Sequence, residues 1–384
     1  MAEKKPKVLV GMSGGVDSSL SAALLLEQGY EVIGAFMKNW SGSTKVSEDT
    51  EEFVECDWRS ERRDAMRVAA QLGIPFLTFD FEKEYRQKVV DYMVAEYAVG
   101  RTPNPDVMCN KFMKFDLFVK EADKLGCDYV ATGHYARQVD GQLLAGLDPN
   151  KDQSYFLCHM PREVLSRVLF PVGGMLKSEV REAAQARGLV VAEKKDSQGV
   201  CFIGEINMTE FLKERIPENP GNIVFKGPSP GDGESRVLGQ HRGLAFYTIG
   251  QREGLNIGGL ETPYYVVEKR AETNELVVSS NFHEALYRSE LTASSMNWLV
   301  DPLVFASEAK QPQEIASSAY GLLAKTFHCS ARIRYRQPLE ACTVQVLEYG
   351  RLHVKFEKPQ RAVTPGQFIV FYDGDVVLGG AVIE

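Results

Sequence analysis

Three glycines, two serines and an aspartate stand close together in residues 11–18, near the start of the chain. An apolar run at residues 8–10 precedes this segment, and the apolar periodicity of a helix follows it from Leu20. A strand that turns through glycines into a helix N-terminus aims several backbone N–H groups at one point. Such a turn binds phosphate without a cationic side chain. Ser13 and Ser18 add hydroxyl donors, and the Asp17 carboxylate is suited to hold Mg²⁺ on phosphates.

The pattern Ser-Gly-Gly-x-Asp-Ser at residues 13–18 resembles the pyrophosphate loop of the ATP pyrophosphatase superfamily. The Gly-Lys-Ser/Thr ending of a Walker A sequence is missing. Enzymes with the pyrophosphate loop split ATP between its α and β phosphates and adenylate an oxygen atom of the substrate. The resemblance therefore implies adenylation rather than hydrolysis of the γ-phosphate, and a plain glycine turn is the alternative interpretation.

Cys109 is one of two cysteines whose neighbours could activate a thiol. Prolines 103 and 105 predict an extended or turn conformation, so we expect a helix to begin only after residue 111. At the start of that helix the dipole and Lys111 would favour the thiolate of Cys109. Asp106, three residues earlier, would act as a base or grip a polar ligand. The local sequence fits a small buried apolar residue equally well.

Cys201 is the second such cysteine, in a polar segment with two lysines and a glycine at residues 194–202. A mobile, electropositive loop is where a reactive thiolate or persulfide is expected, although the side chain could also pack inward. The other cysteines lack such neighbours. We interpret Cys127, Cys158, Cys329 and Cys342 as packing residues, and we assign no role to Cys56.

Three further polar sites each have a functional and a structural interpretation. His134 ends a predicted strand, where it binds a ligand or simply satisfies backbone groups. Asp152 follows a Pro-Asn turn, and capping of a helix explains it as well as binding does. Residues 332–336 alternate arginine with other residues, so a strand there would present three arginines on one face, suited to phosphates. A solvated barrel edge is the alternative.

Strand and helix patterns alternate over the first two hundred residues, which predicts an α/β fold with a doubly wound parallel sheet. The expected strands are 7–12, 31–37, 76–81 and 129–134, and the expected helices are 18–28, 60–72 and 114–125. Ligands of such folds bind outside the carboxyl ends of the strands. We therefore expect residues 11–18, Met37, Gly133 and His134 to converge at that edge.

The sequence pattern changes near Asn219, where turn-forming residues lead into short strand-like runs as far as residue 280. From residue 329 the tail is strand-rich again, at 331–335, 343–347, 352–356 and 368–372, which suits a compact β-barrel. Residues 290–323 are less patterned and are a candidate insertion. We expect a pyrophosphate-loop catalytic domain at 1–215, a small β-rich central domain at 216–290 and a C-terminal β-barrel at 291–384.

The composition is that of an ordinary globular protein: 384 residues, 44% hydrophobic and 25% charged. No apolar run is long enough to span a bilayer, and the first residues read as neither a signal nor a transit peptide. Seven scattered cysteines without a Cys-x-x-Cys pair favour a reducing cytoplasm over a disulfide framework. The net charge of −8 argues only mildly against nucleic acid, because a local basic surface can act within an acidic whole.

Six motifs taken together resemble bacterial tRNA-specific 2-thiouridylases. They occur in the order of that family, with similar spacing, and they cover nearly the whole chain. The motifs occupy residues 11–18, 104–111, 131–135, 151–156, 196–204 and 247–252.

The resemblance implies formation of 2-thiouridine at the wobble position of tRNAs for glutamate, glutamine and lysine. ATP, with Mg²⁺, would adenylate the C2 oxygen of the uridine. A persulfide on Cys201, received from a sulfur-relay protein, would then replace AMP at that carbon. Cys109 would attack the sulfur and end in a transient disulfide with Cys201. Asp106 would be the acid/base group.

The resemblance also implies two sets of binding residues. Those for ATP are Gly11, Met12, Ser13, Gly14, Gly15, Val16, Asp17, Ser18, Met37 and Gly133. Those for tRNA are Asn104, Pro105 and Asp106 around the target base, and His134, Lys151, Asp152, Gln153, Arg334, Tyr335 and Gln367 elsewhere.

Two other classes of protein compete with this hypothesis. A small-molecule ligase or amidase with the same loop, such as argininosuccinate or GMP synthetase, needs no paired reactive cysteines. A non-catalytic RNA-binding or sulfur-carrying module needs no intact pyrophosphate loop. One departure from the family is that residues 301–324 look longer than usual.

Overall fold

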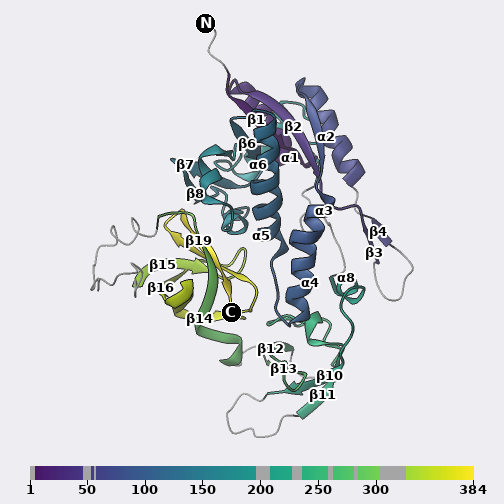
Figure 1. The fold of residues 1–384 in the computed structure, drawn as a ribbon, viewed down its shortest axis with the longest axis vertical. Coiled ribbons are helices and arrows are strands. Elements are labelled where there is room, and N and C mark those ends of the chain that lie inside the picture. Colours follow the sequence, from purple (N-terminus) through teal and green to yellow (C-terminus); the bar gives the residue numbers. More distant parts are fainter. Residues whose placement is uncertain are drawn as a thin grey trace.

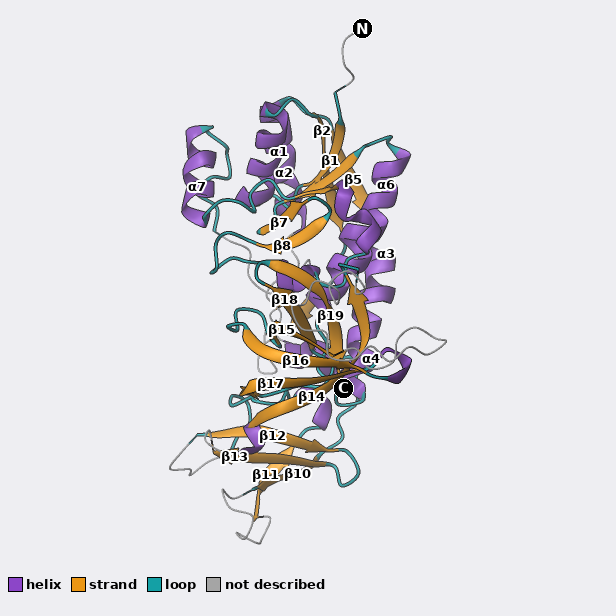
Figure 2. Ribbon diagram, turned by 90° about the vertical axis from the view of Figure 1, so that its left-hand side faces the viewer, coloured by secondary structure: helices purple, strands orange, loops and turns teal. Residues whose placement is uncertain are grey.

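The computed structural model describes residues 5–45, 53–55, 58–195, 208–226, 236–257, 263–280, 284–301 and 326–384. Three β-structures follow one another down the long axis of the molecule (Figures 1 and 2). A parallel sheet lies nearest the N-terminus, a closed antiparallel sheet lies in the middle, and a small antiparallel sheet lies at the far end.

The first β-structure confirms the predicted doubly wound parallel sheet. Its strand order is β5-β2-β1-β6-β9. The strands are β1 (Lys7–Gly11), β2 (Glu31–Lys38), β5 (Phe76–Asp80), β6 (Tyr129–Thr132) and β9 (Val168–Leu169). Alternate residues of β1 face opposite ways, so Val8 and Val10 belong to one buried cluster and Leu9 to another. Both faces of the sheet are therefore covered.

Helices on the two faces supply these two clusters. The helices are α1 (Val16–Glu27), α2 (Trp58–Leu72), α3 (Glu82–Tyr85), α4 (Asp91–Ala98), α5 (Pro105–Cys109), α6 (Phe118–Lys124), α7 (Lys177–Ala186) and α8 (Met208–Lys213). Apolar residues of α1, α2 and α7 pack with Val8 and Val10, whereas those of α4, α5 and α6 pack with Leu9. In Figure 1, α6 and α5 form one column that reaches from the sheet toward the barrel, and α4 lies lower and to the right of it.

The helix that carries Cys109 begins earlier than the sequence predicts. Helix α5 starts at Pro105 and runs without a break into a π-helix at Asn110–Leu117 and then into α6. Pro105 occupies the first helical position, where its missing N–H costs nothing and its fixed φ suits the helix. Proline at 105 therefore marks the start of this helix and not a segment that precedes it.

The second β-structure is the predicted β-barrel. Its strands are β14 (Tyr287–Trp298), β15 (Thr326–Arg332), β16 (Glu340–Val346), β17 (Leu352–Arg361), β18 (Phe368–Asp373) and β19 (Val376–Ile383). Pairing of β14 with both β17 and β19 closes the sheet. Strand β14 corrects the expectation that residue 290 opens a poorly patterned stretch. Strand β15 ends at Arg332, so the expected strand 331–335 is wrong.

A hairpin from the first part of the chain extends the barrel sheet. Strands β7 (Ala136–Val139) and β8 (Gln142–Ala145) form it, and β8 pairs with β19 at Leu144 and Val376. Its turn is Asp140-Gly141, both with positive φ, which is a favoured two-residue hairpin turn. We did not predict this hairpin, although the Asp-Gly pair is its sequence signal.

The third β-structure, at the far end, has the strand order β11-β10-β13-β12. Its strands are β10 (Gly221–Phe225), β11 (Arg236–His241), β12 (Tyr264–Arg270) and β13 (Glu275–Ser280). A separate two-stranded pair joins β3 (Ser43–Lys45) and β4 (Phe53–Glu55). Among the described residues, no helix combines the length and the apolar character needed to cross a bilayer.

Candidate functional site

The glycine-rich loop connects β1 to α1 as the sequence predicts. Gly14 has φ of +78°, and Gly15 is the N-cap of α1. Because Gly15 has no side chain, no side-chain cap accepts from the first N–H groups of α1. The Ser18 hydroxyl accepts from the Ser13 N–H at 3.1 Å and lies 3.3 Å from the Ser13 hydroxyl. This arrangement is a helix N-terminus suited to an anion.

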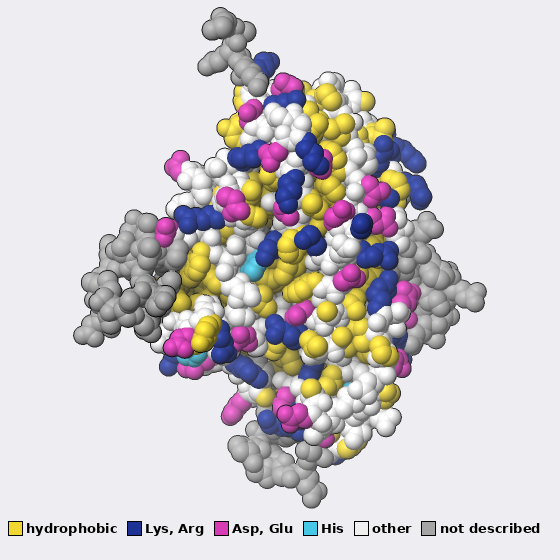
Figure 3. Space-filling model, viewed as in Figure 1, with side chains coloured by type: hydrophobic (Ala, Val, Ile, Leu, Met, Phe, Trp, Pro, Cys, Tyr) yellow, Lys and Arg dark blue, Asp and Glu magenta, His cyan; other side chains and the backbone are white. Residues whose placement is uncertain are grey.

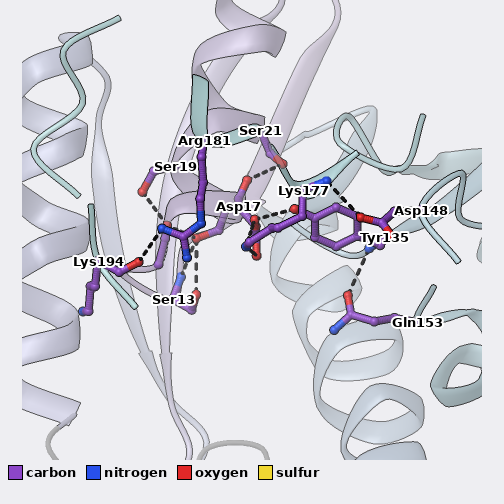
Figure 4. A network of polar contacts seen from close by, with 12 residues as sticks. Ser13, Asp17, Ser19, Ser21, Tyr135, Asp148, Gln153, Lys177, Arg181 and Lys194 are labelled. Carbon is purple, nitrogen blue, oxygen red and sulfur yellow. Dashed lines mark hydrogen bonds and ion pairs between the residues drawn. The ribbon is translucent and has the colours of Figure 1, made fainter. Parts of the chain in front are cut away.

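Asp17, in the first turn of α1, lies in a compact polar network (Figure 4). Lys177 Nζ donates to both carboxylate oxygens, at 2.7 and 2.9 Å, and Tyr135 Oη donates to Oδ1 at 2.8 Å. The Lys177 backbone N–H in turn donates to Asp148 at 3.0 Å. In this conformation the Asp17 carboxylate is therefore balanced by an ammonium group. The Asp17 side chain is 30% exposed, so it remains accessible to solvent.

Two glycines allow neighbouring elements to approach this loop closely. A Cβ added to Gly133, just after β6, would lie 2.6 Å from the Ser18 nitrogen and 2.8 Å from the Asp17 carbonyl carbon. A Cβ added to Gly14 would lie 2.2 Å from the Glu61 carbonyl oxygen of α2. Met37 is the penultimate residue of β2, next to β1, and its Sδ-methyl would touch a Cβ on Gly11 at 3.2 Å. The structure thus brings Met37 and Gly133 to the edge where the loop lies.

Cys109 is completely buried and is the fifth residue of α5. It is not at the helix N-terminus as predicted, and the effect of the helix dipole decreases within the first turn. Asn104 is the N-cap, and its side-chain oxygen accepts from the Val107 N–H at 3.2 Å. Half-buried Asp106 lies in the first turn of the same helix. Burial lowers the pKa of Lys111 from its ordinary value.

His134 is buried, with 8% of its surface exposed. Lys114 Nζ lies 3.2 Å from Nε2, and Thr132 Oγ1 lies 2.7 Å from Nδ1. Because an ammonium group only donates, Nε2 accepts and the proton is on Nδ1. Burial, and then the Lys114 charge, hold the pKa of His134 well below its ordinary value. The imidazole is therefore neutral at physiological pH.

The motif at residues 151–156 lies between the parallel sheet and the barrel. Gln153 accepts from the Tyr135 N–H at 3.0 Å. Asp152 accepts from the Gly146 N–H at 2.9 Å and forms a buried ion pair with Arg332, 2.6 Å away. Lys151, which opens the motif, is half-buried.

The other three residues expected to contact tRNA also make contacts within the protein. Arg334 Nη2 lies within 3.1 Å of the carbonyls of Ile249 and Ala362. The Tyr335 ring packs against Phe156, with ring centroids 4.5 Å apart. Gln367 Nε2 donates to the carbonyls of Thr102 and Pro103, at 3.1 and 2.9 Å.

The expected face of three arginines is not formed. Arg332 ends β15 with its side chain buried, Arg334 follows in a turn, and Arg336 has positive φ of +64°. A pocket of about 410 Å³ lies beside this turn, between the β7–β8 hairpin and the barrel. Arg137 and Arg336 line it together with the ion pair of Asp152 and Arg332. Arginine side chains thus gather around a pocket and not along a strand.

Cys201 and Cys56 lie outside the described residues. Cys127, Cys158 and Cys342 are buried and Cys329 is partly buried, as expected for packing residues. Lys177 and Tyr135 are the site residues that sequence reasoning missed. Tyr135 follows His134 inside a recognised motif and could have been found there, whereas Lys177 reaches Asp17 from 160 residues away and has no local signal.

Comparisons with known proteins cover nearly the whole chain. Family models match residues 6–205 (tRNA methyl transferase HUP domain), 209–280 (tRNA methyl transferase PRC-barrel domain) and 288–383 (aminomethyltransferase β-barrel domain). A curated relative from Listeria welshimeri serovar 6b, named tRNA-specific 2-thiouridylase MnmA, is 49% identical over 383 residues, which are 98% of this chain and 94% of the relative. A relative of the same name from Halalkalibacterium halodurans is 48% identical and covers 100% of this chain and 97% of its own.

A solved 4-thiouridine synthetase–RNA complex with bound ATP aligns with a TM-score of 0.33 at 16% sequence identity. The alignment covers 55% of this chain and 50% of that one. So remote a similarity adds nothing to the assignment.

Proposed function

Because the chain belongs to the tRNA-specific 2-thiouridylase family, we propose that it replaces the C2 oxygen of the wobble uridine, U34, with sulfur. The substrates would be the tRNAs for glutamate, glutamine and lysine, and the products would include AMP and pyrophosphate. The observation that carries this proposal is identity of 49% over 98% of the chain to a protein of that name. We expect the enzyme to work in the cytoplasm.

The first step would be adenylation. The C2 oxygen of U34 attacks the α-phosphorus of ATP, and pyrophosphate leaves. The N–H groups at the start of α1 and the hydroxyls of Ser13 and Ser18 would bind the departing phosphates. We propose residues 11–18 with Met37 and Gly133 as the ATP site. The Asp17 carboxylate would hold Mg²⁺, which neutralises phosphate charge when bound.

The second step would be sulfur transfer. The terminal sulfur of a persulfide on Cys201 attacks C2, and AMP departs with the C2 oxygen. The Cys109 thiolate then attacks the Cys201 sulfur, which releases 2-thiouridine and forms a Cys109–Cys201 disulfide. A cellular thiol reductant returns both thiols, and a sulfur-relay protein renews the persulfide. Asp106, two residues into α5, would take and return the protons.

Recognition of tRNA would use the surface around the target base and the barrel. Asn104, Pro105 and Asp106 would contact the extruded base, and extrusion from a single-stranded loop costs less than from a duplex. His134, residues 151–153, Arg334 and Tyr335 would contact the rest of the tRNA. Lys and Arg side chains are spread over the face in Figure 3, among hydrophobic and acidic ones. The arginine-lined pocket beside the barrel would suit phosphates.

The proposal is tested by mass spectrometry of nucleosides. Unmodified tRNA is incubated with the protein, ATP, Mg²⁺ and a persulfide sulfur donor, and is then digested. We expect 2-thiouridine at U34, with AMP and pyrophosphate formed in equal amounts. Formation of ADP and inorganic phosphate, with unmodified anticodons, would contradict the proposal.

The variant Cys201→Ser tests whether adenylation and sulfur transfer are separate steps, with Cys201 needed only for sulfur transfer. This variant should form no 2-thiouridine but should still release pyrophosphate in the presence of tRNA, because adenylation precedes sulfur transfer. Loss of adenylation as well would show that Cys201 does more than carry sulfur. Cys127→Ser, which alters a cysteine with no proposed chemical role, is the control and should retain both activities.

A further inference from the structure

Helix α5, which carries Asp106 and Cys109, is preceded by four residues, 100–103, that lie outside any helix or strand. These four residues, called the connection below, lead from α4 to the N-cap of α5. We propose that Gln367 is a positioning residue that fixes this connection. The barrel and the small sheet of β10–β13 with its adjoining loops, called the central β-module below, would thereby together determine the position of α5. This inference rests on the proposed function only where it predicts effects on thiolation.

Gln367 holds the connection by its side-chain amide. Nε2 has two hydrogens, and it donates to two consecutive carbonyls, those of Thr102 at 3.1 Å and Pro103 at 2.9 Å. Both donors of Nε2 are thus used within the protein. Pro103 is buried, and the next residue, Asn104, caps α5. A shift of the Pro103 carbonyl would therefore move the start of the helix.

The barrel also touches the connection through its backbone. The Thr102 N–H donates to the Pro365 carbonyl at 2.9 Å. The next residue, Gly366, has φ of +92°, and a Cβ there would lie 2.9 Å from both the nitrogen and the carbonyl oxygen of Thr102. The turn that presents Gln367 thus packs directly on the connection. Only glycine suits both the conformation and the space.

The central β-module touches the same four residues from its own side. Lys269 Nζ, on β12, donates to the Gly100 carbonyl at 3.0 Å. The hydroxyl of Thr248 lies 3.2 Å from that of Thr102. Three of the four carbonyls in the connection are therefore held by side chains from distant parts of the chain.

Arg334 contacts both the central β-module and the barrel, and it thereby links these two parts to each other. Its Nη2 contacts the Ile249 carbonyl of the central module, at 3.1 Å. The same nitrogen contacts the Ala362 carbonyl at 3.1 Å and Thr364 Oγ1 at 2.9 Å, both in the barrel turn that leads to Gln367. The connection, the central module and the barrel thus meet at one junction, directly before the helix that contains Asp106 and Cys109.

This role predicts a kinetic signature that differs from that of a tRNA contact. A misplaced α5 lowers kcat, because reacting groups held slightly out of place lose roughly ten- to hundredfold in rate. A lost tRNA contact instead raises KM for tRNA and leaves kcat unchanged. Gln367→Met removes both hydrogen bonds and keeps a side chain of similar length. Gln345→Met, on strand β16 of the same barrel, is the matched control.

Two measurements on these variants test the inference. We expect Gln367→Met to lower kcat for thiolation by about tenfold or more, with KM for tRNA within about twofold of wild type. Without any substrate, hydrogen–deuterium exchange of the peptide spanning residues 104–113 should be faster in Gln367→Met and unchanged in Gln345→Met. Lys269→Met, which removes the bond to Gly100, should give the same two effects and serves if Gln367→Met does not fold.

A rise in KM for tRNA with unchanged kcat would overturn the inference and make Gln367 a tRNA contact. Unchanged exchange in residues 104–113 would also overturn it, whatever the kinetics. If the wild-type protein fails to thiolate tRNA, the proposed function is wrong, and the exchange measurement still decides whether Gln367 positions α5.

Discussion

The Asp17 carboxylate lies among the N–H groups that we propose to receive phosphate, so its charge would repel ATP unless it is balanced. Lys177 and Tyr135 supply that balance through three short hydrogen bonds. At such distances, and with Lys177 only 12% exposed, the attraction is screened less than in bulk water. Mg²⁺ at Asp17, as we propose it, would free the Lys177 ammonium to interact with the phosphates nearby.

Asp17→Ala should reduce pyrophosphate release about a hundredfold or more, because it removes the proposed Mg²⁺ ligand and leaves the Lys177 charge unbalanced. Tyr135→Phe removes one hydrogen bond worth about 1 kcal/mol, so we expect roughly a fivefold loss. Release is measured with ATP, Mg²⁺ and tRNA, and Glu27→Gln, at the other end of α1, is the control. Unchanged release in Asp17→Ala would show that the ATP site lies elsewhere.

Cys329 and Cys342 are direct cross-strand partners on β15 and β16, with sulfurs 3.7 Å apart. Glutathione disulfide should oxidise them to a disulfide, with two glutathione thiols released, and a peptide that links both residues should appear in non-reducing mass spectrometry. Cys342→Ser should abolish it. Both thiols remaining open to alkylation would contradict the prediction. Peptide mapping must distinguish the Cys329–Cys342 disulfide from any disulfide between Cys109 and Cys201.

At the scale of elements, the proposed ATP site depends on how closely β6 and α2 approach the start of α1. The contacts at Gly133 and Gly14 are with backbone atoms, which cannot move aside as a flexible side chain can. The strand, the loop and the two helices therefore form one packed unit, in which an added side chain at Gly133 or Gly14 has no room.

Gly133→Ala should lower the free energy of unfolding by about 1–3 kcal/mol and weaken ATP binding, because the new methyl group overlaps the Ser18 nitrogen. Gly174→Ala is the matched control, since no atom lies within 4 Å of the added Cβ. Its effect should stay within about 0.5 kcal/mol. Urea unfolding and calorimetric titration with ATP measure the two quantities. Equal effects in both variants would refute the close approach.

At the scale of the whole molecule, buried polar residues join the parallel sheet to the barrel. Besides the Asp152–Arg332 ion pair, Tyr155 Oη donates to the Phe368 carbonyl at 2.9 Å and Ser154 Oγ lies 3.1 Å from Tyr372 Oη. These contacts are buried, so separating the parallel-sheet part from the barrel would leave polar groups without hydrogen-bond partners. We therefore expect the two parts to unfold together.

Buried histidines should make the molecule less stable in mild acid. Burial lowers the pKa of His134 and His241, and it lowers the pKa of His159 to about 4. Below about pH 6.5 the unfolded chain binds protons that the folded chain does not, so the free energy of unfolding falls as pH falls. Each such histidine contributes up to about 1.4 kcal/mol per pH unit.

The measurement is urea unfolding at pH 7.5 and pH 5.5. His159→Gln keeps a donor for the Gly380 carbonyl, which accepts from His159 Nε2 at 3.0 Å, but it cannot titrate. This variant should lose less stability between the two pH values than the wild type does. An identical loss would show that His159 does not contribute to the pH dependence.

The amino-acid sequence by itself determined the parallel sheet, the glycine-rich loop and the barrel, because hydrophobic periodicity and glycine placement act over a few residues. Residues 11–18 and the strand ends near Met37 and Gly133 were located from such local patterns. The start of α5 was predicted wrongly, since Pro105 reads locally as a break although it fits the first position of a helix.

Only the tertiary structure decided what the polar side chains contact. Lys177 reaches Asp17 across 160 positions, and Gln367 reaches Pro103 across 264. Arg332 is buried against Asp152 and is not one of three exposed arginines on a strand. No local pattern encodes such pairs, because hydrogen bonds and ion pairs act over a few ångströms in space between residues that are far apart in the chain.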